Sequence, residues 1–227
     1  MDDVFLEEDD NFMVVKYTTR TTMMRFFNSE IIASPLKIEA ILNPMPDTSQ
    51  EDIARIMAKF KFLFSGLVNN AIAFTFDNKA ALGAVIGENG KNRTSNMIMI
   101  TPYDPSDELL ATLFQAKMTA LGMGLIEVES CSVTSKDSQG LSYTFVGNGS
   151  DMMPDIISWI GERSYFKEPW WDRNDASLLD IVPQADADLT DTPAWAYSLD
   201  TVLAPKPAAG IVVRPDFKPK VLDGGKS

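Results

Sequence analysis

Two extended segments near the start of the chain constrain the fold most strongly. Residues 12–27 read FMVVKYTTRTTMMRFF, a run of β-branched and aromatic residues with polar residues interleaved, which is typical of a long strand. After a turn at 28–30, residues 31–42 are expected to be its hairpin partner. Pro35 in that partner indicates an edge position or a bulge, because proline has no N–H to donate to a neighbouring strand. We therefore expect a sheet built around this hairpin.

Two helices are predicted from apolar residues that recur at steps of three and four. The first spans residues 49–68, with Ser49 as its N-cap and Asp52 at the third helical position, which resembles a capping box. The second spans residues 105–121, with Asp104 as its N-cap. Each apolar stripe is expected to face a core.

The rest of the body is assigned from shorter patterns. Further strands are expected at 71–76, 80–86, 96–101, 125–134 and 141–146, and a third helix at 152–163. The order is ββα-βββα-ββα, an α+β fold with mainly antiparallel sheet packed with two or three helices. Residues 47–66 and 104–124 look alike, which fits either an internal duplication or helices that simply share the same capping rules.

The net charge of -12 is distributed unevenly along the 227 residues. Counted by segment it is -6, -1, -8 and +3 for residues 1–10, 11–150, 151–200 and 201–227. We expect three parts: an acidic N-terminal arm at 1–10, an α+β body at 11–164, and an extended C-terminal arm at 165–227 that is acidic and then Pro-rich and basic. Because the body is nearly neutral, the overall charge does not exclude a nucleic-acid partner for it.

The absence of histidine excludes several kinds of active site. A Ser-His-Asp triad, a Cys-His pair and a His-ligated zinc all need a residue that this chain lacks. The one cysteine, Cys131, cannot form an internal disulfide and is expected to be a buried thiol. The chain shows neither a signal-peptide pattern at its start nor a membrane-spanning apolar run, so a cytoplasmic protein without membrane contact or a cofactor is expected.

The C-terminal arm carries the most distinctive binding candidates. Paired tryptophans beside a proline either fold back over the body or dock in a partner's pocket, and an apolar run among prolines can add a strand to a neighbour's exposed edge. The candidate partner-binding residues are Trp170, Trp171, Trp195, Ile211, Val212, Val213, Arg214 and Phe217.

A basic face on the first hairpin is an alternative site. Basic side chains beside aromatic rings can hold single-stranded RNA or DNA by phosphate contact and stacking. The candidates are Lys16, Tyr17, Arg20, Lys37, Lys91 and Arg93, whereas strict alternation turns Arg25 to the other face. A third hypothesis is a metal-dependent enzyme that uses the carboxylates of Glu127 and Glu129, for which a solvated strand face is the simpler interpretation.

The leading hypothesis is a non-enzymatic assembly or adaptor protein that binds a partner or sister subunits through its arms. A small α+β body with an arm at each end is similar to the accessory and structural proteins of tailed bacteriophages. That resemblance implies a structural protein located in the bacterial host cytosol or the virion.

Overall fold

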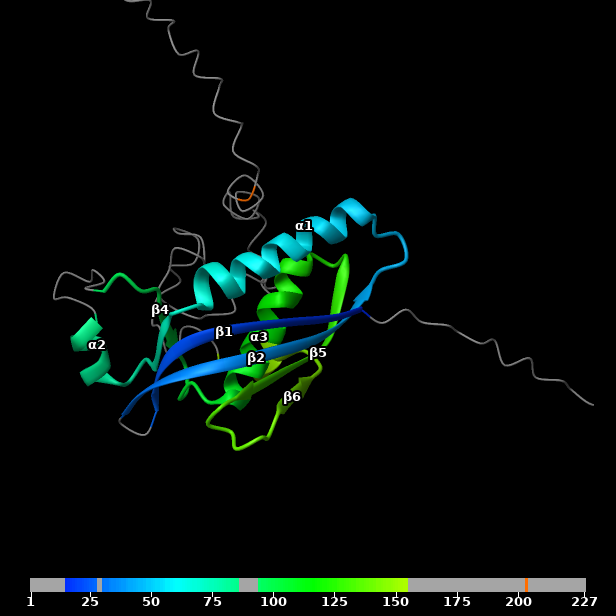
Figure 1. Ribbon diagram of the computed structural model, residues 1–227. Helices are drawn as coiled ribbons and strands as arrows, with labels where there is room; N and C mark the ends of the chain where they lie inside the picture. Colours follow the sequence, from blue (N-terminus) through cyan, green and yellow to red (C-terminus); the bar gives the residue numbers. More distant parts are fainter. Residues whose placement is uncertain (1–14, 28–29, 86–93, 155–202, 204–227) are drawn as a thin grey trace, which may run out of the picture.

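A computed structural model describes residues 15–27, 30–85, 94–154 and 203, which form a sheet with helices on both faces (Figure 1). The elements in chain order are β1 (Val15–Phe27), β2 (Glu30–Pro44), α1 (Gln50–Lys61), η1 (Phe62–Val68), β3 (Ile72–Thr75), α2 (Lys79–Val85), β4 (Ile98–Thr101), α3 (Asp107–Gly122), β5 (Ile126–Ser135), β6 (Tyr143–Val146) and η2 (Gly149–Met152). No helix in the described part of the chain is long and apolar enough to cross a membrane.

The six strands form one sheet in the order β4-β3-β1-β2-β5-β6. The predicted first hairpin is confirmed: β1 and β2 pair antiparallel over their whole length, from Val15 opposite Leu42 to Phe27 opposite Glu30. β5 and β6 continue the antiparallel pattern, whereas β3 and β4 are parallel to β1. The predicted α+β class, with a sheet packed against helices, is confirmed.

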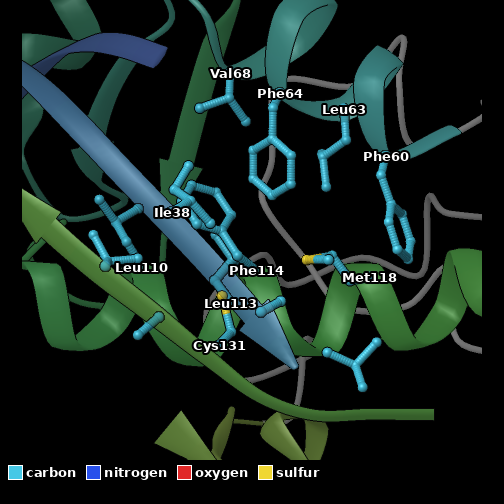
Figure 2. Close-up of a cluster of buried hydrophobic side chains, with 14 of the residues drawn as sticks. Ile38, Phe60, Leu63, Phe64, Val68, Leu110, Leu113, Phe114, Met118 and Cys131 are labelled. Carbon is cyan, nitrogen blue, oxygen red and sulfur yellow. The ribbon is translucent and has the colours of Figure 1, made fainter. Parts of the chain in front are cut away.

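The main core lies between one face of the sheet and the helices α1, η1 and α3. On β2 the side chains of Leu36, Ile38, Ala40 and Leu42 alternate with more exposed ones and point to this core. Figure 2 shows Phe60, Leu63 and Phe64 pointing from α1 and η1 towards Phe114 and Met118 of α3. The rings of Phe64 and Phe114 meet edge to face, with centroids 5.2 Å apart.

A smaller apolar cluster lies on the opposite face of the sheet. Ile72 and Phe74 of β3 point to this side, while Ala73 between them belongs to the main core. Ala81 and Val85 of α2 pack on it, so α2 covers the β3–β4 end of the face that α1 and α3 leave open (Figure 1).

The helix predicted at 49–68 is confirmed as α1 followed by η1. Ser49 caps it, accepting a hydrogen bond from the Asp52 backbone N–H at 3.1 Å. From Phe62 onward the coil widens to a π-helix, which adjusts where Leu63, Phe64 and Val68 enter the core.

The second predicted helix is confirmed, but its N-cap is two residues later than expected. Ser106, not Asp104, caps α3, and its hydroxyl accepts a hydrogen bond from Leu109 N–H at 3.2 Å. The backbone carbonyl of Asp104, and not its carboxylate, accepts a hydrogen bond from Ser106 N–H in the turn before the helix. At the other end, Met123 takes the left-handed conformation after Gly122.

The strand predicted at 80–86 is wrong, because this segment forms the helix α2. Asn78 supplies the signal, since its side-chain oxygen accepts a hydrogen bond from Ala81 N–H at 2.9 Å, as an N-cap does. The topology requires a crossover here, because the parallel strands β3 and β4 cannot be joined by a tight hairpin.

The other predicted elements have mixed outcomes. The strands expected at 71–76, 96–101, 125–134 and 141–146 are confirmed as β3, β4, β5 and β6. Pro35 lies one residue outside the pairing of β2 with β5, which begins at Leu36, so β2 is an edge at that point. Of the helix predicted at 152–163, all but the first residues lie outside the described ones, and the duplication stays a prediction.

Cys131 tests the packing of the main core directly. Its side chain is fully buried, and burial raises the pKa of the thiol to about 12. We therefore expect iodoacetamide at pH 8 to leave the folded protein unmodified and to add one carbamidomethyl group in 6 M guanidinium, measured by intact mass. Rapid labelling of the native protein would contradict the packing.

Candidate functional site

Among the described residues, only α2 covers the face of the sheet opposite α1 and α3, and it lies at one end. In this part of the structure β1, β2, β5 and β6 therefore present an open polar surface. Cross-strand rows define this open face. One row places Arg20 opposite Lys37 and Lys37 opposite Thr134. The next runs from Thr18 through Glu39 and Ser132 to Thr144 on β6, where the Ser132 and Thr144 hydroxyls lie 2.8 Å apart.

Three of the predicted nucleic-acid contacts gather on this open face. Lys16 and Lys37 both reach Glu39, with N–O distances of 2.6 and 2.7 Å, and these hydrogen bonds hold the pKa of the Glu39 carboxyl below its usual value. Arg20 is exposed and has no ion pair with any described residue. The positive charge of this face is therefore partly neutralised, and Arg20 is its free cation among the described residues.

The other predicted nucleic-acid contacts are not brought to this face. Tyr17 points to the main core, where its ring lies 5.6 Å from Phe60 edge to face, and burial raises the pKa of its hydroxyl. It cannot stack a base on the open face, because adjacent strand residues point to opposite sides. Lys91 and Arg93 lie outside the described residues.

A hollow lies beside Arg20. It has a volume of about 420 Å³, and its walls combine apolar surface from Pro35 and Leu36 with the polar and basic residues Arg20, Thr21, Thr22, Lys37, Asn69 and Thr134. The Asn69 side-chain oxygen accepts from Thr22 N–H at 3.3 Å, which fixes this loop against the edge of β1. With an arginine, a lysine and hydroxyl groups around it, the hollow is suited to an anionic group such as a phosphate.

The last hairpin carries a group of exposed apolar side chains that the sequence analysis missed. Leu141, Tyr143 and Val146 are 62%, 40% and 67% exposed. β6 is the end strand of the sheet, so among the described residues no strand covers its outer edge. The short run 141–146 predicted a strand, but only the strand order shows that this strand lies at the edge of the sheet.

A buried polar network lies at the other end of β1, where the sheet meets the start of α3. Arg25 Nη1 donates to Asp107 Oδ1 at 2.6 Å, and both side chains are less than a tenth exposed. Arg25 Nη2 donates to Ser34 Oγ at 2.9 Å, and Asp107 Oδ2 accepts from the Ser135 hydroxyl at 2.6 Å. Asp107, in the first turn of α3, is thus a buried ion-pair partner.

A cavity of about 180 Å³ borders this network. Its walls include Arg25, Asp107, Asp137 and Tyr143. Asp137 is half-exposed and accepts from the Ser34 hydroxyl at 2.7 Å. Both carboxylate oxygens of Asp107 accept hydrogen bonds from protein donors. We therefore interpret the cavity as space beside a structural ion pair and not as a binding site.

The carboxylates considered for metal chemistry are separated by a bulge. Glu127 pairs opposite Asn43, while Glu129 falls at the irregularity in the β2–β5 ladder and accepts from the Asn43 amide at 3.2 Å. Both are exposed. Within the described ranges, no group of three or more Asp, Glu, Cys or His side chains is arranged to hold a metal ion.

The predicted partner-binding residues of the C-terminal arm lie outside the described residues. They are Trp170, Trp171, Trp195, Ile211, Val212, Val213, Arg214 and Phe217. One arm residue is described: Leu203 packs against the main core. The chain therefore returns to the body at residue 203 before its last 24 residues.

The buried ion pair makes a testable prediction about stability. Arg25→Met would leave the Asp107 carboxylate buried without its cation, so we expect the free energy of unfolding to fall by about 3–5 kcal/mol in urea titrations. The double variant Arg25→Met/Asp107→Asn should recover part of this loss. The exposed Arg20→Met is the control, expected within about 0.5 kcal/mol of wild type, and an equal effect of both single variants would contradict the role of Arg25.

Comparison with known proteins adds no relative. Neither a protein-family model nor a curated protein matches the sequence. Function must therefore be inferred from the open face, the edge at β6 and the contact of Leu203 with the main core.

Proposed function

We propose that this chain is a non-enzymatic assembly or adaptor protein that binds a partner protein or sister subunits through its C-terminal arm. The observation that carries the proposal is the edge of the last hairpin, where Leu141, Tyr143 and Val146 are exposed. Tyr143 and Val146 point to opposite faces of β6, and large apolar side chains on both sides of an uncovered sheet edge are typical of a strand that another chain pairs with. The resemblance in architecture to tailed-bacteriophage accessory proteins supports the same class of function.

The position of Leu203 adds support, because it links the arm to the core. A partly buried leucine on the main core gives the arm a fixed origin on the body. The residues beyond it carry a net charge of +3, with basic side chains interspersed with prolines, whereas residues 1–10 and 151–200 carry -6 and -8. An arm of opposite charge favours docking on another acidic surface, including that of a sister copy.

Truncation after Leu203 tests the proposal and keeps the contact of that residue with the core. We expect the wild type to elute as an oligomer or to retain a partner, and the variant lacking residues 204–227 to be a folded monomer by light scattering and circular dichroism. A chain with residues 204–227 scrambled is the matched control and should behave like the truncation. An unchanged mass for both variants, with no partner lost, would overturn the proposal.

A second candidate function is binding of single-stranded RNA or DNA on the open face. The observation that favours it is the hollow between Arg20 and Lys37, where an unpaired guanidinium and hydroxyl groups suit a phosphate. Against it, Glu39 neutralises part of the charge, and Tyr17 is turned to the core.

Charge reversal in the hollow tests this second candidate. Arg20→Glu should weaken binding of a fluorescent oligonucleotide at least tenfold and lower the slope of affinity against salt by about one phosphate contact. Lys61→Glu makes the same charge change at an exposed position on α1, across the sheet, and should have little effect. Salt-insensitive binding, or equal losses in both variants, would exclude the open face.

A further inference from the structure

We propose that the outer edge of β6 is the docking site for residues 211–214 from the arm of a second copy, which add to the sheet as a seventh strand. The inference rests on the proposed function and names the partner and the surface. The hydrogen-bonding pattern of β6 identifies the surface, and the composition of the arm identifies the partner.

Successive residues of β6 direct their backbone N–H and C=O groups in turn towards β5 and towards the outer edge. Gly147 N–H donates to Glu129 O at 3.4 Å, just beyond the end of the strand. In an antiparallel ladder every second residue bonds the same neighbour, so Tyr143 and Phe145 bond β5 while Thr144 and Val146 point their N–H and C=O groups outward. Two residues thus present free donors and acceptors to an incoming strand.

The edge at β6 lacks the charged side chains found on the part of β1 that β3 does not pair. β4, at the other end of the sheet, likewise has no charged residue and no proline. β3 pairs with β1 only at Met24 and Arg25, so no described strand lies beside the first half of β1, and that half carries Lys16 and Arg20. β6 contains neither a charged residue nor a proline. Charges and prolines on edge strands prevent pairing with other chains, so their absence from β6 favours a strand partner there.

The segment that fits this edge is short, apolar and bounded. Ile211, Val212 and Val213 have high strand propensity, and they lie between Gly210 and Pro215. Pro215 cannot donate a backbone hydrogen bond, so an added strand ends at residue 214 and has four residues, the length of β6.

Charge and reach agree with an occupant from a neighbouring copy. Glu129 is exposed and its carbonyl accepts from Gly147 N–H just beyond β6, Glu127 is exposed two residues earlier on β5, and the arm carries Arg214 and Lys218 next to its apolar run. From Leu203 to Ile211 the chain spans at most about 28 Å. This exceeds the radius of gyration of about 14 Å expected for a body of this size, so the segment can extend to a second molecule.

Removal of the outward N–H group of Val146 by substitution with proline tests the docking site. Val146→Pro removes an outward donor without removing a bond to β5, whereas the matched control Val146→Thr keeps the donor and the branched shape. Light scattering should show a monomer for the proline variant and the wild-type mass for the control, with unchanged circular dichroism for both. If the proline variant assembles as wild type while the truncation after Leu203 does not, β6 is not the site and the proposed function stands.

Peptide binding gives a second measurement that does not depend on the stability of the proline variant. A fluorescent peptide of residues 208–218 should bind the chain truncated after Leu203, and the same peptide with Val212→Pro should bind at least tenfold more weakly. Equal binding of both peptides would overturn strand addition. A monomeric wild type that excludes the peptide, when the truncated chain binds it, would show that each arm occupies its own β6 and would overturn the second copy as its source.

Discussion

The ion pair between Arg25 and Asp107 is the interaction on which the arrangement of the other elements depends. Arg25 belongs to β1, Asp107 begins α3, and the groups that share their hydrogen bonds come from β2 and β5. One buried contact therefore fixes where α3 starts on the sheet and where the β5–β6 hairpin turns. A desolvated pair of this kind contributes little net stability compared with an apolar pair, but once either partner is present the other is required. Its effect is to select one placement of α3 over alternatives that would leave a buried charge unpaired.

The alternation of side chains along the strands decides which surface is available for binding. On β1 the odd positions, including Tyr17 and Met23, point to the main core and the even positions point to the open face. On β5 the bulge at Glu129 changes this phase, so that Val128 before it and Cys131 after it both point inward. A shift of one residue would otherwise have moved the second half of β5 out of the core.

Much of the fold could be predicted from local patterns, and the failures have specific physical causes. The first hairpin and the helix at 49–68 were predictable because each has a clear period and recognisable turn or capping residues. The segment 80–86 was not, since a short run of alanine, leucine and valine fits a strand or a helix, and only the parallel pairing of β3 with β4 decides the matter. The site was harder to predict, because the partnership of Arg25 with Asp107 joins residues 82 positions apart. That Lys16 and Arg20 share a face followed from alternation alone, but the inward orientation of Tyr17 was overlooked.

The two ends of the sheet differ in a way that bears on function. At one end Ile98 and Thr101 of β4 are buried and Met99 and Ile100 are partly buried, and the smaller cluster beneath α2 covers one face of the strand. At the other end β6 has Phe145 packed against the main core while Tyr143 and Val146 remain exposed. The inner side of β6 is thus anchored by α3 and the core, whereas its edge and outer side are not covered by any described residue. A strand added at this end would continue a sheet that already has its supporting layer, and it would bury apolar surface without breaking an existing hydrogen bond.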